Sequence, residues 1–377
     1  MGAEFRDFKV ELFRGGISYG YVKNVKSCRV TLTSKAKTNS LELVVNNRAN
    51  YLTDGGDLRF QQDDIIKVYA AAGIVDTSNS DHLIGTFFVK NFELQPEGKS
   101  MKLICGDHTF DLLNRIYFST GTAHTARDNI FNIVQTVNEQ GYTQNSIEVD
   151  MPLTKHDGDP FKEIQYPSAT KTAYVCVNDL SQQEMTGDDR EYLFWFDENN
   201  KFHWKYPNND VMGNIIYGLD PVLSMQGGLS ESDTISSVIF NCGTDLNGTG
   251  ITGFYHDDTS YSTNIKNVPM IDISRDLKFL HKAEIDAGTY TNSMLIDDAV
   301  LLGEGRARRI ISNVGTGTWK STVKVRGQKY PMSAVYIVGD VTNNFAPQRM
   351  RLKRVVHTMD KNGWSTQLEL EQDPKFE

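Results

Sequence analysis

Short runs of alternating apolar and polar residues follow one another closely between Phe8 and Asp107. Turns rich in Gly, Asn and Asp separate them, and an alternation of period two is typical of strands with one buried face. The runs are Phe8–Phe13, Cys28–Leu32, Leu41–Val45, Ile65–Ala70, Gly85–Leu94 and Met101–Gly106. Closely spaced strands of this kind form an antiparallel barrel or sandwich, so we predict a β-barrel domain over residues 1–115.

A helical period then replaces the alternation. Apolar residues from Ile130 to Val137 recur on one helix face, and Thr125 can cap the N-terminus of that helix. A second helix is expected within Ser168–Gln183. Aromatic residues face one another across the polar DENNK turn of Tyr192–Tyr206, which indicates a hairpin. We therefore predict a middle α+β domain over residues 116–222.

Strand patterns return in the last third of the chain. We predict a second β-barrel from two discontinuous pieces, residues 223–245 and 312–377. The segment between them, residues 246–311, is expected to be an insertion that ends in a helix over Ser293–Ile311. The predicted fold is mainly β with α+β insertions and two antiparallel barrels.

Two hairpins in the chain align with each other. Each hairpin is preceded by an apolar strand (IIKVYA or AVYIVGD) and then by a polar stretch, and each has a glycine in its turn, Gly98 or Gly363. The aligned pairs, at constant spacing, are Leu94 with Met359, Leu103 with Leu368, and Cys105 with Leu370. The hairpins alone fit duplication and coincidence equally well, and the preceding strand favours duplication. Three such chains around an axis would place six similar barrels in a closed ring.

Composition narrows the class of protein. A chain of 377 residues is too long for one ordinary core, and its formal charge of −9 argues against holding nucleic acid by phosphate neutralisation. The cysteines, which are expected to be buried free thiols in a reducing compartment, show no metal or disulfide spacing: Cys28, Cys105, Cys176 and Cys242. No leader pattern or membrane-spanning apolar run is seen, so the sequence favours a soluble protein made in the cytoplasm.

Several short patterns resemble catalytic or ligand-binding motifs, and each lacks a feature that the motif requires. Gly16–Gly20 fits G-x-S-x-G, but a strand rather than a helix is expected to follow, so Ser18 is predicted to be a loop serine. Gly243–Gly250 lacks the Lys of a phosphate loop and is interpreted as a turn. Asp245–Gly248, within it, lacks the third acidic ligand and the bidentate Glu of a calcium loop.

Histidines beside carboxylates and an arginine cluster also have plainer interpretations. Lys155–Asp159 and Tyr255–Asp258 could join a metal or general-base site, but neither has a second His at helical spacing, which favours solvated loops. Arg306–Arg309 could bind phosphate. Acidic Asp297, Asp298 and Glu304 on the same helix favour a salt-bridged surface or subunit contact. No catalytic, cofactor-binding or metal-ligating residue is predicted, and no enzymatic activity.

The order of features along the chain supports a family resemblance. Leu103–Arg115, Tyr192–Trp204, Val238–Ser260 and the closing hairpin Arg351–Asp373 together resemble the baseplate hub protein of contractile phage tails. That family includes late control protein D and the hub portion of type VI secretion spike proteins. The resemblance covers nearly the whole chain and lies in strand and turn patterns rather than catalytic signatures.

The resemblance implies a structural role in a virion. It implies a homotrimer whose ring of six barrels joins the hexameric tail tube to the trimeric central spike at the distal tail baseplate, with assembly in the bacterial cytoplasm. Other baseplate proteins are implied partners, DNA is expected to pass the channel without specific binding, and no membrane insertion or cofactor is expected. A channel wall richer in carboxylates than in basic groups is expected. Because the chain ends at Glu377 without a needle repeat, the spike and any lytic activity are expected in other polypeptides.

Two alternatives stay open at the level of sequence. A carbohydrate-binding or carbohydrate-degrading β-rich tail protein would use aromatic runs such as Tyr192–Phe196 as an exposed platform, with paired carboxylates in a groove, and would be a monomer. A receptor-binding tail protein would also be trimeric, but would need a fibrous or separate tip domain.

Overall fold

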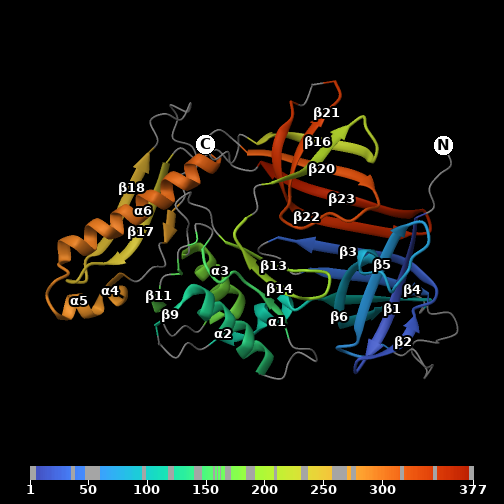
Figure 1. Ribbon diagram of the computed structural model, residues 1–377, viewed down its shortest axis with the longest axis horizontal. Coiled ribbons are helices and arrows are strands. Elements are labelled where there is room, and N and C mark those ends of the chain that lie inside the picture. Colours follow the sequence, from blue (N-terminus) through green and yellow to red (C-terminus); the bar gives the residue numbers. More distant parts are fainter. Residues whose placement is uncertain are drawn as a thin grey trace.

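The protein is mainly β, with helices in its middle and in an insertion (Figure 1). The computed structural model describes residues 6–372 except 35–38, 47–59, 96–98, 118–122, 140–146, 156–157, 159, 162, 166–170, 184–191, 208–209, 231–236, 257–269, 273–276, 315–317 and 343–345. Most strands belong to one 13-stranded sheet. No helix in these described ranges is long and apolar enough to cross a membrane.

One end of the large sheet is formed by what we call the first unit. Its strands, in the order in which they pair, are β3 (Val25–Thr33), β4 (Ser40–Asn46), β7 (Ser100–Gly106), β6 (Leu83–Leu94), β5 (Ile65–Ala72) and β1 (Arg6–Arg14). Each contains one of the predicted alternating runs, so these strands are confirmed. A strand that the sequence did not predict, β2 (Ile17–Tyr21), pairs with the outer side of β1.

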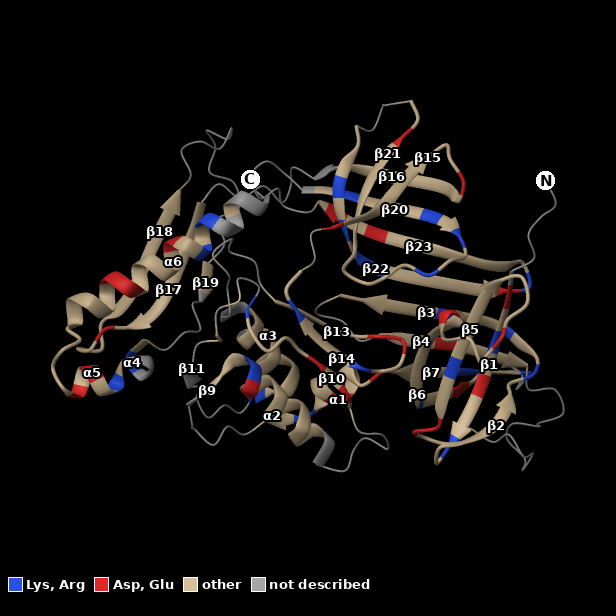
Figure 2. Cartoon of the chain, in the orientation of Figure 1, with Lys and Arg blue, Asp and Glu red and all other residues tan. Residues whose placement is uncertain are grey.

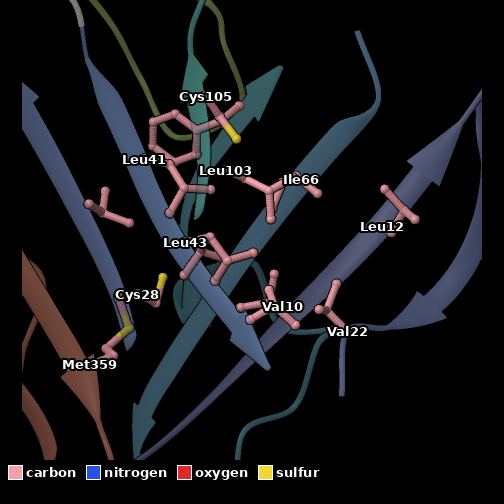
Figure 3. Packing of buried hydrophobic residues seen from close by; sticks show 14 of the residues in the cluster. Val10, Leu12, Val22, Cys28, Leu41, Leu43, Ile66, Leu103, Cys105 and Met359 are labelled. Atoms are coloured by element: carbon pink, nitrogen blue, oxygen red, sulfur yellow. The ribbon is translucent and has the colours of Figure 1, made fainter. Parts of the chain in front are cut away.

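The apolar faces of these strands enclose one core. It contains Val10, Leu12, Cys28, Leu41, Leu43, Ile66, Leu103 and Cys105, all nearly without exposed surface (Figure 3). Met359 and Trp364, which are distant in sequence, belong to the same cluster. The core of the first unit is therefore completed by the closing hairpin of the chain.

The other end of the sheet is the second unit. Its strands, in pairing order, are β16 (Val222–Ser230), β20 (Thr318–Arg326), β23 (Gly363–Gln372), β22 (Gln348–Asp360), β21 (Val335–Asp340) and β15 (Val211–Tyr217). Its core includes Val323, Val338, Leu352 and Leu368. The two units therefore arrange strands from different parts of the chain in the same spatial order.

The first strands of the two hairpins, β6 and β22, have a β-bulge at equivalent positions. Val89 pairs with Cys105 and Asn91 with Ile104, leaving Lys90 as the extra residue. Leu352 likewise pairs with Leu370 and Arg354 with Glu369, leaving Lys353 extra. A bulge inserts one unpaired residue and bends the strand, so its recurrence matches the two hairpins residue by residue.

This match corrects part of the alignment made from sequence. Cys105 with Leu370 and Leu103 with Leu368 are equivalent, as predicted, but Leu94 corresponds to His357 rather than Met359. The two turns differ in length, and a constant spacing cannot accommodate that difference. Gly363 lies next to its turn with φ of +104°, whereas Gly98 lies outside the described residues.

A second shared bulge extends the equivalence to β3 and β16. The register of β3 against β4 shifts between Val25 and Ser27, and that of β16 against β20 shifts between Val222 and Ser224. The two units differ at one border, because β1 runs antiparallel to β5 whereas β15 runs parallel to β21. The repeat is thus a repeat of strand order and register, with one reversed strand.

The middle of the chain has its own core. Its elements are α1 (Thr109–Asn114), α2 (Ala126–Glu139), α3 (Ala173–Gln183), the hairpin β13 (Leu193–Phe196) and β14 (Phe202–Lys205), and the short strands β8 (Ile116–Tyr117), β9 (Ala123–Thr125), β10 (Val149–Asp150), β11 (Glu163–Gln165) and β12 (Lys171–Thr172). The Thr125 hydroxyl accepts a hydrogen bond from Asp128 N at 3.1 Å, which confirms the predicted N-cap. Both predicted helices and the hairpin are present.

The insertion forms a separate layer in which a long helix covers a small sheet (Figure 1). Its elements are β17 (Ser237–Thr244), β18 (Gly250–His256), β19 (Met270–Asp272), α4 (Leu277–Leu280), α5 (Lys282–Asp286) and α6 (Asn292–Val314). The sequence assigned residues 223–245 to the second barrel, but β17 pairs with β18 and β19. It also left residues 211–217 in the middle domain, whereas β15 pairs with β21. Period-two alternation shows that one face is buried, not which partner buries it.

A glycine in α6 sets how closely that helix approaches the small sheet. A Cβ added at Gly303 would lie 2.1 Å from the ring of the buried Phe240 of β17, whereas one at Gly305 would meet nothing within 4 Å. We expect Gly303→Ala to destabilise the protein by about 1–3 kcal/mol through overpacking. Gly305→Ala should be neutral or stabilising by up to about 1 kcal/mol, because Ala favours the helix. Chemical denaturation of both variants checks this, and equal effects would contradict it.

Candidate interaction surfaces

The nucleophile-like serine lies on a strand. Ser18 is in β2, exposed, and its hydroxyl donates to a carboxylate oxygen of Glu11. The prediction of a loop serine was wrong in that detail, but a strand does follow Gly20, as expected from the sequence. The strand–turn–helix geometry that would make Ser18 a nucleophile is not the geometry of this segment.

The calcium-like segment is a turn. Asp245 Oδ1 accepts hydrogen bonds from Asn247 N at 2.9 Å and Thr249 N at 2.8 Å, and Gly248 has φ of +86°. Asn292 Nδ2 donates to the other carboxylate oxygen at 3.1 Å and ties the turn to the start of α6. Within the described residues, no group of three or more His, Cys, Asp or Glu side chains is placed to hold a metal ion.

The remaining polar patterns are only partly described. His256 Nδ1 lies 2.8 Å from the Ser237 hydroxyl across the β17–β18 pair, whereas Asp257 and Asp258 lie outside the described residues, as do His156, Asp157 and Asp159. In α6, Arg308 Nε donates to the Tyr255 hydroxyl at 3.2 Å, and its guanidinium lies over that ring. Arg308 therefore fastens the helix to the sheet beneath it.

A polar cleft of about 950 Å³ separates the first unit from the β13–β14 hairpin. Basic and acidic side chains both line it, among them Lys67, Glu148, Asp197 and Lys201. Asn200 Nδ2 donates to Thr86 O at 2.9 Å between the two parts. The buried His108 also borders the cleft, with its Nδ1 3.0 Å from Asp111 Oδ2, and burial raises the pKa of the neighbouring Asp107 to about 7. Sequence reasoning missed this cleft because its lining residues come from separate segments.

Most of the aromatic residues that favoured a carbohydrate site are core residues, whereas Trp195 and Tyr206 are partly exposed. Tyr192, Phe202 and Trp204 have no exposed surface, and Tyr192 stacks on Trp204 with ring centroids 4.3 Å apart. The indole N–H of Trp204 donates to the Ser181 hydroxyl of α3 at 2.9 Å. They join the hairpin to the helices and present no aromatic platform to solvent.

The two units meet along a joint between β3 and β22. These strands pair antiparallel, from Arg354 opposite Thr33 to Asp360 opposite Ser27. The joint is apolar on one face, where Met359 points toward Cys28 (Figure 3). β22 reaches both units because its first residues pair with β21 and its later residues with β3.

A buried histidine lies in this joint. The indole N–H of Trp364 donates to His357 Nδ1 at 3.2 Å, and His357 is 1% exposed. Burial, with a smaller contribution from Lys329, lowers the pKa of His357 to about 3. The imidazole is therefore neutral at physiological pH, and the joint holds no buried charge at this position.

Among the described residues, β15 is one edge of the large sheet with exposed apolar side chains, because it pairs only with β21 and Val211, Met212 and Tyr217 are at least 43% exposed. Three further segments also present such edges. β16 ends the strand order and pairs on one side only, with β20, among the described residues. β2 ends it on the other side, with Ile17, Tyr19 and Tyr21 each at least 44% exposed. The third is the last part of β6, where Phe92 and Leu94 are 49% and 59% exposed. Edges of this kind invite pairing with another chain.

Known structures share this fold. No family model and no curated protein sequence matches the chain. The 43 kDa tail protein of prophage MuSo2 from Shewanella oneidensis matches with a TM-score of 0.65 and 15% identity over 96% of this chain and 98% of its own. A tail protein from Neisseria meningitidis MC58 matches at 0.62 and 12% over 97% of both chains. Prophage tail protein gp18 from Listeria monocytogenes EGD-e matches at 0.57 and 9% over 98% of this chain and 95% of its own.

The chain therefore has the fold of phage tail proteins over nearly its whole length. The resemblance to baseplate hub proteins drawn from the sequence is confirmed at the level of the fold.

Proposed function

We propose that this protein is a baseplate hub of a contractile phage tail or tail-like particle. In this proposal it is a homotrimeric adaptor that joins the hexameric tail tube to the trimeric central spike. The observation that carries the proposal is the repeat of strand order, register and bulges within one chain. Two equivalent units per chain allow three chains to present six similar units to a sixfold partner and three to a threefold partner.

Each unit is proposed to act as a tail-tube-like barrel in the ring. Support comes from the way each set of strands surrounds its own apolar cluster. The strand pairing suggests domains over residues 6–115 and 116–205, a second barrel over 211–230 and 318–372, and an insertion over 237–314.

The proposed partners follow from this role. They are two further copies of the chain, a central spike protein, the tail tube or its initiator ring, and other baseplate proteins, in the virion at the distal end of the tail. Segments with Lys or Arg and segments with Asp or Glu are interspersed along the described strands of the large sheet (Figure 2). Together with the net charge of −9, this fits a channel that DNA passes without adhering, with a wall richer in carboxylates than in basic groups. We assign the protein no enzymatic activity.

The oligomeric state tests the proposal. Light scattering of the purified protein should give three times the chain mass of 42.5 kDa, and negative-stain images should show a ring with a central channel. A monomer, or a trimer without a channel, would contradict the hub function. On a size-exclusion column at physiological salt, addition of a short double-stranded DNA should leave the elution position of the protein unchanged.

A further inference from the structure

We propose that the free edge of β16 pairs antiparallel with the end of β6 of a second copy, placing Asn91, Phe92, Glu93 and Leu94 opposite Ser230, Leu229, Gly228 and Gly227. This inference rests on the proposed homotrimer and specifies how its subunits join. The internal repeat leads to it. Among the described strands, one pair joins the two units, β3 of the first with β22 of the second. The equivalent of β3 is β16 and the equivalent of β22 is β6, so the next joint requires a neighbouring chain.

The register follows from pairs shared by the two units. Phe92 pairs with Leu103 as Val355 pairs with Leu368, so Phe92 is the equivalent of Val355, and Leu94 that of His357. Cys28 pairs with Leu43, and Met225 pairs with Val323, at equivalent places in β3 and β16. Within the chain, Val355 lies opposite Leu32 and His357 opposite Val30. Transferring these pairs puts Phe92 opposite Leu229 and Leu94 opposite Gly227.

The exposure of equivalent residues differs between the two units of one chain, as expected if the strand that covers the edges of β6 and β16 belongs to another chain. Val355 and His357 are 0% and 1% exposed, since β3 lies beside them, whereas Phe92 and Leu94 are about half exposed or more. On the other strand, Val30 is fully buried and the equivalent Gly227 is exposed. The residues that are buried in the joint between β3 and β22 are thus the ones whose equivalents in β16 and β6 are exposed to solvent.

The sequence of β16 is suited to receive this strand. Gly227 and Gly228 carry no side chains, and a Cβ placed at Gly228 would meet nothing within 4 Å. A bulky cross-strand neighbour such as Leu94 can therefore cover the glycine backbone, which shields glycine in a strand. The contact is head-to-tail, because the two edges are different surfaces, and head-to-tail contacts close into rings when the rotation permits.

Cysteine pairs at the predicted register test the joint. Residues directly opposite in a ladder have Cβ atoms about 4.5–5.5 Å apart, and neighbouring pairs alternate between hydrogen-bonded and non-hydrogen-bonded types. We therefore choose two adjacent pairs, Glu93→Cys with Gly228→Cys and Leu94→Cys with Gly227→Cys. Under mild oxidation, at least one should give covalent dimers and trimers on non-reducing gels, and mass spectrometry should identify the joined peptides.

A shifted pair provides the control. Glu93→Cys with Ser224→Cys moves one partner four residues along β16, about 13 Å at the rise of a strand, and should not cross-link. A light-scattering trimer in which neither chosen pair cross-links, or in which the shifted pair cross-links equally well, would overturn this joint and leave the hub function intact. A monomer would overturn both.

Discussion

The double variant Phe92→Glu, Leu94→Glu is expected to purify as a folded monomer, while the unchanged protein purifies as a trimer. The two side chains are 49% and 59% exposed in the single chain, so charge there should alter the stability of the monomer little. In the proposed joint they enter the position that Val355 and His357 occupy within the chain, where carboxylates would be buried without partners. A trimeric ring has three such joints, so the free-energy cost of burying the carboxylates applies three times.

Light scattering measures the mass, and circular dichroism with thermal melting shows whether the monomer is folded. Ile74→Glu is the matched control, because Ile74 is an apolar residue 87% exposed elsewhere on the first unit. That variant should remain a trimer. If the double variant also remains a trimer, or if both variants dissociate, the β6 edge is not the subunit contact.

Trp364→Ala is expected to lower the free energy of unfolding by about 3–5 kcal/mol, the usual range for removing a large core aromatic. Trp364 is 6% exposed and lies with the core of the first unit, although it belongs to a strand of the second. A Cβ added at Gly327 would lie 2.2 Å from this ring, so the backbone beside it is closely packed. Removing the indole would leave a cavity where the two units meet.

Trp364→Phe is the informative comparison. Phe keeps most of the ring and loses the N–H that donates to His357 Nδ1, so we expect a cost of about 1–2 kcal/mol. Urea denaturation followed by two probes, one in each unit, should show a single transition for both variants. A cost below about 1 kcal/mol for Trp364→Ala would mean that the joint contributes little to stability.

Strands were predictable where one face is buried and the other is wet. β3, β4, β7 and β23 show that alternation, and the capped helix α2 shows the corresponding period of a helix. β5 and the first part of β6 are buried nearly throughout, and they were predictable as short apolar runs between turns. The sequence did not predict β2 and β15, because few of their side chains are buried and their apolar and polar residues therefore alternate little. β17 was found but placed in the wrong sheet, because alternation carries no information about the partner strand.

The candidate surface was less predictable than the fold. The similarity of the two hairpins was visible in the sequence, but the bulges at Lys90 and Lys353 are differences in pairing rather than in residue type, so the alignment of one strand was wrong by two residues. Phe92 and Leu94 looked like ordinary strand residues. Their exposure follows only from the absence, among the described residues, of a strand beside them, and that required the pairing order.

The position of β22 in the chain bears on the order of events during synthesis. β3 leaves the ribosome early, but the strand that covers its outer edge lies more than 300 residues later, since Thr33 pairs with Arg354. Throughout elongation that edge is open and resembles the edge of β16 to which β6 of another copy would bind. Nascent chains on one messenger could pair wrongly at this edge, because exposed strand edges in incomplete chains favour misassembly. Completion of β22 closes it, so only a finished polypeptide would offer the correct edge to its neighbours.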